Sequence, residues 1–166
     1  MKRSIVIAGL GIVAAGTFAV SPTAQAEERV CRGTIGAQTV DNLRVPSDAS
    51  CTLRGTRVQG TVKVEAGARL DASGIRVIGN VQAEGHRDVR VVSSMVGGSV
   101  QLKQGATATL QHNNVKGDVQ SFTNRGAQTF RANVIDGNLQ CKENAPAPTG
   151  GGNTVGGNKE DQCARL

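Results

Sequence analysis

A short pattern of valine and glycine returns every 19 residues through the middle of this 166-residue chain. Self-similarity at a fixed period is the signature of stacked structural repeats. Five coils can be written in one register and a less regular sixth follows; the central glycines of the pattern are Gly60, Gly79, Gly98, Gly117 and Gly137. The five regular coils cover residues 41–59, 60–78, 79–97, 98–116 and 117–136, and the sixth covers 137–156.

Within a coil, apolar and polar residues alternate, as in Val62-Lys63-Val64. A period of two is typical of short β-strands with one buried face. Small residues between these stretches, as in Ala66-Gly67-Ala68, suit sharp turns. The sequence therefore predicts an all-β, single-domain parallel β-helix (β-solenoid) with about 19 residues per coil and five to six coils. A sandwich or barrel of short strands is the alternative, but antiparallel hairpins do not require a constant register of 19 residues.

The first 26 residues have the pattern of a secretory signal peptide. Positions 2 and 3 are basic, residues 5–20 are almost wholly apolar, and Ala24-Gln25-Ala26 offers a small-residue cleavage site. We expect cleavage before Glu27 and a secreted protein, extracellular or cell-wall associated, with no transmembrane segment after the signal is removed. Retention of the apolar run as a membrane anchor is the alternative.

Four cysteines in an exported chain form an even set, and oxidation to disulfides is their expected state. Cys31 and Cys51 are 20 residues apart, and Cys141 and Cys163 are 22 apart, which is about one coil in each case. Neighbouring coils bring stacked Cα atoms to about 4.8 Å, inside the range that a disulfide needs. We therefore predict the bonds Cys31–Cys51 and Cys141–Cys163, one at each end of the solenoid. A metal site or a catalytic thiol is the alternative.

Both ends of the mature chain depart from the regular repeat. We expect residues 27–40 to form an N-terminal cap before the five-coil solenoid of 41–136, and residues 137–166 to form a last coil with a disulfide-closed C-terminal cap. Two prolines and three consecutive glycines make residues 144–158 loop-like. Such a loop would protect an open strand edge, block end-to-end stacking and keep the protein monomeric. The alternatives are an exposed hook for a partner and a self-assembling polymer.

Charge and aromatic content limit the classes of partner. Loss of the two basic residues in the signal lowers the formal net charge from +6 to +4, and this charge is spread along the chain. Nucleic-acid binding needs a basic patch and, for single strands, aromatic stacking platforms. Phe122 and Phe130 are the only Phe, Tyr or Trp residues after the signal, so we expect neither nucleic-acid binding nor a sugar-stacking groove.

One regular polar surface emerges when the coils are stacked. It consists of an outward glutamine column and a second polar column beside it: Gln82, Gln101, Gln120 and Gln140, with Asn80, Ser99, Asp118 and Asn138. Stacked amides hydrogen-bond along the stack and stabilise it without any ligand. The same strip is the leading candidate for a binding face that docks glycan hydroxyls or another protein.

Charged residues on a second face offer an enzymatic alternative. Asp71 and Arg90 share one outward column, and Arg69 and Asp88 share another. In a polysaccharide-cleaving β-helix, carboxylates and an arginine on one strand face could bind calcium and abstract a proton. Cross-strand charge pairing is the structural interpretation of the same residues.

The two histidines after the signal do not suggest a metal centre. His86 and His112 occupy different offsets in their coils, so we expect them to be separate, solvated corner residues. The sequence therefore predicts no metal and no cofactor.

Several stretches also resemble a known family. They are residues 41–46, Gly137-Asn138-Leu139-Gln140-Cys141, residues 148–153 and Lys159-Glu160-Asp161-Gln162-Cys163. With these stretches the chain resembles a family of small, uncharacterised exported β-solenoid proteins of actinobacteria. More distantly, its coils are similar to bactofilins, which form filaments from short right-handed β-helices but lack the secretory signal and the cysteines found here.

These features favour a non-enzymatic, secreted structural or binding module of the cell envelope or extracellular space. It would present a rigid polar solenoid face to cell-wall glycan or to another envelope protein. The alternative is a calcium-dependent carbohydrate-active enzyme of the β-helix type. Calcium-dependent protection against unfolding, together with cleavage of an acidic glycan, would favour the enzyme.

Overall fold

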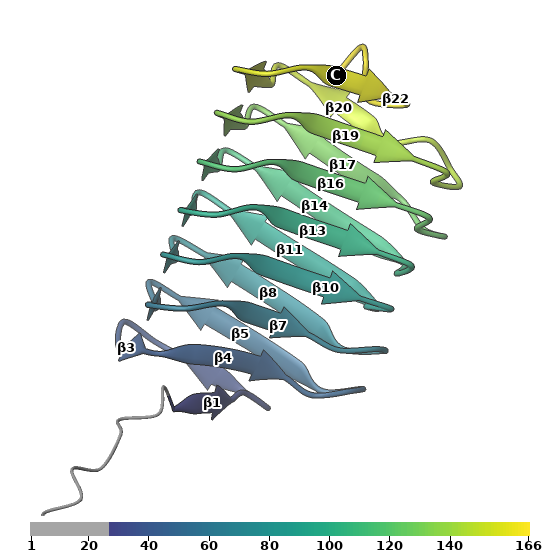
Figure 1. Ribbon diagram of the computed structural model, residues 1–166. Coiled ribbons are helices and arrows are strands. Elements are labelled where there is room, and N and C mark those ends of the chain that lie inside the picture. The colour runs from purple at the N-terminus through teal and green to yellow at the C-terminus, as the bar shows by residue number, and fades with distance from the viewer. Residues whose placement is uncertain (1–26) are drawn as a thin grey trace, which may run out of the picture.

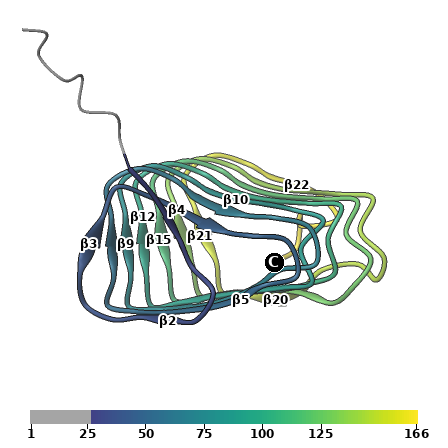
Figure 2. The ribbon, with the colours of Figure 1, turned by 90° about the horizontal axis from the view of Figure 1, so that it is seen from below.

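The computed structural model describes residues 27–166, which are built from β-strands and turns without a helix. The chain winds through about seven coils, and each coil contributes three short strands to three parallel sheets (Figure 1). Viewed along the stack, the coils superimpose as one elongated outline (Figure 2). The predicted all-β parallel solenoid is therefore confirmed.

We name the three sheets A, B and C. Sheet A contains β1 (Glu28–Val30), β4 (Asn42–Val45), β7 (Val62–Val64), β10 (Val81–Glu84), β13 (Val100–Lys103), β16 (Val119–Phe122), β19 (Leu139–Lys142) and β22 (Lys159–Asp161). Sheet B contains β2 (Thr34–Ile35), β5 (Ser50–Arg54), β8 (Arg69–Ser73), β11 (Asp88–Val92), β14 (Thr107–Gln111), β17 (Gln128–Arg131) and β20 (Thr149–Gly151). Sheet C contains β3 (Thr39–Val40), β6 (Arg57–Val58), β9 (Arg76–Val77), β12 (Met95–Val96), β15 (Asn114–Val115), β18 (Val134–Ile135) and β21 (Thr154–Val155).

The solenoid extends further toward both ends than the repeat indicates. Residues 28–40 carry β1, β2 and β3, which pair in parallel with the coil above them. Residues 144–158, expected as a loop, carry β20 and β21, which continue sheets B and C. These segments adopt the coil because backbone pairing with a neighbouring coil does not depend on side chains, so the structure reaches about seven coils instead of five to six.

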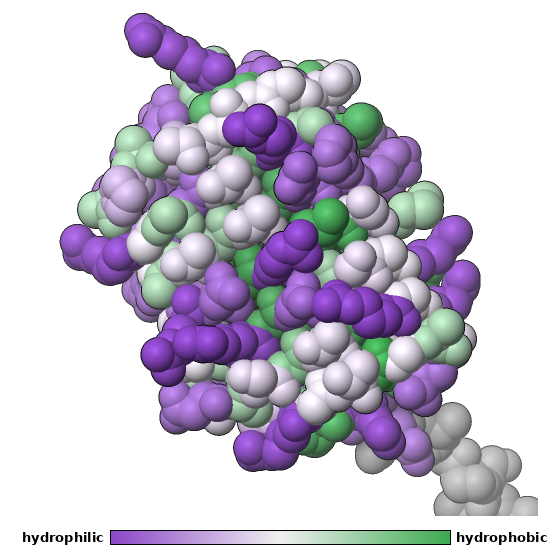
Figure 3. All heavy atoms as spheres, turned by 180° about the vertical axis from the view of Figure 1, so that it is seen from behind, coloured by the Kyte–Doolittle hydropathy of each residue, from purple (hydrophilic) through white to green (hydrophobic). Residues whose placement is uncertain are grey.

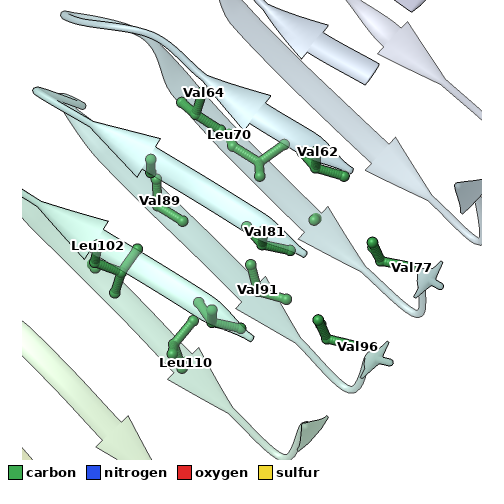
Figure 4. Packing of buried hydrophobic residues seen from close by; sticks show 14 of the residues in the cluster. Val62, Val64, Leu70, Val77, Val81, Val89, Val91, Val96, Leu102 and Leu110 are labelled. Carbon is green, nitrogen blue, oxygen red and sulfur yellow. The ribbon is translucent and has the colours of Figure 1, made fainter. Parts of the chain in front are cut away.

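The core consists of inward side chains stacked in columns between the three sheets. One column in sheet A is registered strand by strand as expected, and all of its members are buried: Val62, Val81, Val100, Val119 and Leu139. Figure 4 shows such side chains meeting between the sheets. Near the C-terminal end, Phe130 is fully buried and lies opposite Gly150 in the register, where an added Cβ would collide with the Phe130 backbone. Glycine at position 150 therefore lets β20 approach the backbone of β17 closely.

Side-chain oxygens close the corner between sheets C and A. The Oδ1 atom of Asn80 accepts a hydrogen bond from the backbone N–H of Ser99 at 2.8 Å, and Ser99 Oγ accepts one from Asp118 N at 3.0 Å. These oxygens occupy the space in which the next coil's glycine would carry its Cβ. The recurring glycine of the sequence pattern is therefore required by close approach of the preceding coil.

Replacing Gly98 with alanine should lower the free energy of unfolding by about 2 kcal/mol, because the added methyl group overpacks this corner. A Cβ at Gly98 would lie 2.9 Å from the carbonyl oxygen of Gly79 and closer still to Asn80 Oδ1. Gly33 is the matched control, since a Cβ there meets no atom within 4 Å. Urea unfolding should show Gly33→Ala near the parent value. Equal stability of both variants would disprove the steric role of Gly98.

Two disulfides join neighbouring coils near the two ends of the stack. Cys31 pairs with Cys51 at a Cα–Cα distance of 5.5 Å, and Cys141 pairs with Cys163 at 5.3 Å. The predicted pairing is confirmed, and the described residues contain no free cysteine. Disulfides of this kind indicate an extracellular or otherwise oxidising environment.

Candidate functional site

The glutamine column on sheet A forms a continuous hydrogen-bonded ladder. The Nε2 atom of Gln82 donates to Oε1 of Gln101 at 3.4 Å, Gln101 donates to Gln120 at 3.2 Å, and Gln120 donates to Gln140 at 2.9 Å. Each amide thus donates toward the C-terminal end of the stack, and Gln101, Gln120 and Gln140 each accept from the N-terminal side. This order holds without exception over four rungs and fixes the otherwise mobile side chains.

Charged side chains continue the glutamine column at both of its ends. Gln140 donates to the carboxylate of Glu160 at 2.9 Å on the C-terminal side. On the N-terminal side the same register position holds Lys63 and then Arg44. The carbonyl end of the ladder therefore faces cations, and its N–H end meets an anion, which suits the direction in which the amide dipoles are aligned.

The ladder leaves hydrogen-bonding capacity free on its outer side. A glutamine amide has two N–H donors and two acceptor lone pairs. Gln101 and Gln120 each use one donor and one acceptor along the ladder. Each therefore keeps one N–H and one lone pair for solvent or a ligand, at the spacing of about 4.8 Å set by the coils.

The second column of the predicted face is mainly structural. Its side-chain oxygens accept backbone N–H groups of the next coil, as described for Asn80 and Ser99, and Asp118 Oδ1 accepts from the backbone N–H of Asn138 at 2.7 Å. Asn138 continues the series by accepting from Asn158 N. These four residues border the glutamine ladder, but their inner oxygens are already engaged.

A shallow hollow of about 640 Å³ lies on sheet A over β7, β10 and β13. Most of its polar lining comes from the glutamine column and from the next outward column toward the carboxyl ends of the strands: Lys63, Gln82, Gln101, Glu65, Glu84 and Lys103. A hydrogen bond from the Ser47 backbone N–H lowers the pKa of Glu65 below its ordinary value, and Arg44 and Lys63 act in the same direction. The hollow thus offers fixed amides between charges of both signs.

The third outward column of sheet A was not singled out by the sequence. Glu84, Lys103, Phe122 and Lys142 lie opposite one another in consecutive strands. Phe122 is partly exposed beside the ladder, although the low aromatic content predicted no stacking platform on the surface. The available signal was alternation: Val119 and Ser121 point inward, so Phe122 must point outward.

Charge pairing accounts for Asp71 on sheet B. Its Oδ2 atom accepts from Arg54 at 2.6 Å and its Oδ1 atom from Arg90 at 3.3 Å. The hydrogen bond from Arg54 is the main cause that holds the pKa of Asp71 below its ordinary value, with Arg90 acting likewise. Because both carboxylate oxygens are engaged by guanidinium groups, a calcium ion would have to displace two arginines to bind here.

The remaining predicted pair on sheet B is Arg69 with Asp88, which lie directly opposite each other. No ion pair joins Arg69 and Asp88 among the pairs within residues 27–166. Partial burial raises the pKa of Asp88, against the opposing effect of Arg69.

Figure 3 shows hydrophilic side chains scattered over the face of the molecule that lies behind the view of Figure 1.

The structure corrects the expectation that His86 is a solvated corner residue, because its side chain is only 1% exposed. The corner after sheet A changes at this coil. The residue with positive φ at this corner is Gly67 in one coil and Gly85 in the next, which is 18 residues later instead of 19. This shift places His86 directly after the positive-φ residue, where the side chain points inward. The imidazole fills the space over Gly105, where a Cβ would overlap the ring.

Burial of His86 has an electrostatic consequence. Neither imidazole nitrogen has a hydrogen-bond partner within residues 27–166. Burial lowers the pKa of His86 to about 4, and the backbone carbonyl of Ala83 opposes this with a smaller effect. His112 is exposed at a corner of sheet B, as expected. Residues 27–166 contain no group of three or more His, Cys, Asp or Glu side chains placed to hold a metal ion.

Comparison of the chain with models of protein families, with curated proteins and with solved structures finds no match. Within residues 27–166 no helix is long and apolar enough to span a membrane. Interpretation of the site therefore depends on its own geometry.

Proposed function

We propose that this protein is a non-enzymatic, secreted binding or structural module of the cell envelope or extracellular space, which presents sheet A to cell-wall glycan. The glutamine ladder is the observation that carries the proposal. It holds polar groups in fixed positions on a rigid sheet, so that binding costs little side-chain entropy. Hydroxyl groups of a glycan both donate and accept hydrogen bonds, which matches the spare N–H and lone pair on each amide.

Location outside the cell is part of the same proposal. Two disulfides support an oxidising compartment. The predicted signal peptide, residues 1–26, lies outside the described residues and supports export through its sequence pattern. Membership of the exported solenoid family that the chain resembles would agree with this location.

The proposal assigns a binding role instead of the polysaccharide-cleaving alternative. The carboxylate of Asp71, which that alternative requires as a calcium ligand, is already held by Arg54 and Arg90. Coils of nearly constant length also provide no long loops to wall a catalytic cleft. We therefore expect the protein to retain glycan without cleaving it, and to act as a monomer.

Retention on isolated cell wall tests the proposal. The exported, oxidised protein should sediment with cell-wall material, and the double variant Gln101→Val, Gln120→Val should bind about tenfold more weakly, because two hydrogen-bonding amides are lost. Valine keeps the strand propensity of these outward positions.

The matched control lies in the same two coils on the opposite sheet. The variant Thr109→Val, Thr129→Val changes two partly exposed outward residues of sheet B and should leave retention unchanged. Absence of retention for the parent protein, or equal losses in both double variants, would count against the role of sheet A. Release of soluble sugar from the wall would favour the enzymatic alternative.

A further inference from the structure

The third outward column of sheet A places an aromatic ring between two cations. Phe122 lies opposite Lys103 on one side and Lys142 on the other. The adjoining rungs of the ladder are Gln101, Gln120 and Gln140, each two residues earlier in the same strand. Ring, ammonium groups and amides therefore share one face of three consecutive strands.

These groups are available to a ligand. Neither Lys103 nor Lys142 forms an ion pair with another side chain of residues 27–166. Lys142 is exposed, and Phe122 and Lys103 are partly exposed. The carboxylate of Asp118, in the polar column on the other side of the ladder, is engaged by the backbone N–H and Nδ2 of Asn138. Two lysines without an ion-pair partner among residues 27–166 and one apolar platform thus face outward, with Glu84 opposite Lys103 on the N-terminal side.

Resting on the proposed function, we propose that this site selects an acidic polysaccharide with a carboxylate on its sugar units, a polyuronate. The C–H face of a sugar ring packs on Phe122, while its hydroxyls meet the spare amide groups of Gln101, Gln120 and Gln140. Lys103 and Lys142 are two rungs apart, about 10 Å. With their side chains extended away from each other, the two lysines contact carboxylates on different sugar units of a chain that runs along the stack.

The charge of the column also limits the site. Glu84 follows Lys103 toward the N-terminal end and would repel a carboxylate. The acid-binding region therefore begins at Lys103 and extends over β13, β16 and β19. Exposed arginines on the other two sheets, such as Arg57 and Arg131, lack both the ring and the ladder beside them.

Binding of polygalacturonate and of its fully methyl-esterified form, measured with the exported, oxidised protein at low salt, tests this inference. We expect the acid to bind at least about tenfold more tightly than the ester, because the ester lacks the charges that the lysines meet. The variant Lys103→Gln, Lys142→Gln should bind the acid about five- to tenfold more weakly. Phe122→Thr should bind it about three- to tenfold more weakly.

The matched control is Arg57→Gln, Arg131→Gln, which removes the same charge from sheets C and B and should bind the acid as the parent does. All of these side chains point out of the stack, so circular dichroism of the variants should equal that of the parent. Phe122→Thr is a separate variant, so the inference is still tested if the lysine double variant folds poorly.

The outcomes distinguish this inference from the proposed function. Equal affinity for acid and ester, with wall retention intact, would overturn the selection of carboxylates and leave the glycan-binding role standing. Equal losses in the control and in the lysine variant, or equally tight binding of dextran sulfate, would show attraction by net charge alone and would also overturn it. Failure to bind either polymer together with failure of wall retention would overturn both.

Discussion

Replacing Asn133 with leucine should lower the free energy of unfolding by about 4 kcal/mol, the largest effect we expect from a single substitution. Asn133 is 2% exposed and lies at the corner after sheet B. Its Oδ1 atom accepts from the backbone N–H and from Nδ2 of Asn113, each at 3.0 Å, and its Nδ2 atom donates to the Leu110 carbonyl at 2.9 Å. Leucine fills a similar volume but leaves these buried groups without their partner, and each such group costs about 1–3 kcal/mol.

Asn114 provides the matched control one coil below. Its Oδ1 atom is buried and has no hydrogen-bond partner in the described part of the chain. Asn114→Leu therefore removes an unsatisfied polar atom and should leave the stability unchanged or raise it slightly. Urea denaturation of the two variants under identical conditions measures the difference. Similar midpoints for Asn133→Leu and the parent would show that the buried asparagines are not what closes this corner.

Lowering the pH from 7 to 4 should cost the protein about 3 kcal/mol of stability through His86 alone. The unfolded chain takes up a proton at His86 near pH 6.5, whereas the folded chain holds this pKa at about 4. Between these values the unfolded state binds more protons, so stability falls as the pH falls through this range. The contribution of His86 is complete above pH 6.5 and fully lost below pH 4.

Comparison with His86→Gln isolates this contribution, because the carboxylates that titrate in the same range are present in both proteins. Glutamine is neutral at every pH used. It is also the residue at the equivalent corner near the C-terminus, where Gln162 Oε1 accepts a hydrogen bond from the backbone N–H of Asn144. Urea unfolding at pH 7, 5.5 and 4 should show the parent losing about 3 kcal/mol more than the variant. His112→Gln, at an exposed corner, should track the parent. Parallel pH profiles for the parent and His86→Gln would contradict a buried, neutral imidazole.

The coil and its register could be predicted because one physical constraint repeats in every turn. The glycine before each corner must admit the side-chain oxygen of the preceding coil, and the flanking valines must point into the core. Both constraints act at a fixed distance along the chain, which produces the period of 19. The disulfides followed from the same period, since cysteines one coil apart lie side by side.

Other features depend on contacts that leave no periodic trace. His86 is buried because the positive-φ residue of its corner comes one residue earlier in the coil than it does in the preceding coil. A count of offsets from the repeated glycine does not detect such a change. Likewise, β20 forms from a glycine-rich stretch because its backbone pairs with β17, and glycine at position 150 leaves room for the backbone of Phe130.

The candidate site shows a similar division. The glutamine column could be recognised from residues that share one register position. Phe122 was missed because composition counts aromatic residues without saying where they lie. Its place beside Gln120 follows from alternation along β16, and its two lysine neighbours belong to other coils.

Because its amides all point the same way, the glutamine ladder is directional, and its two ends differ. Polysaccharides are also directional, since each chain has a reducing and a non-reducing end. A ladder of mixed orientation would have no consistent order of donors and acceptors along the stack. Here a chain laid along the ladder meets donors and acceptors in a different order when it is turned end for end, so the solenoid could distinguish the two polarities of an otherwise uniform polymer.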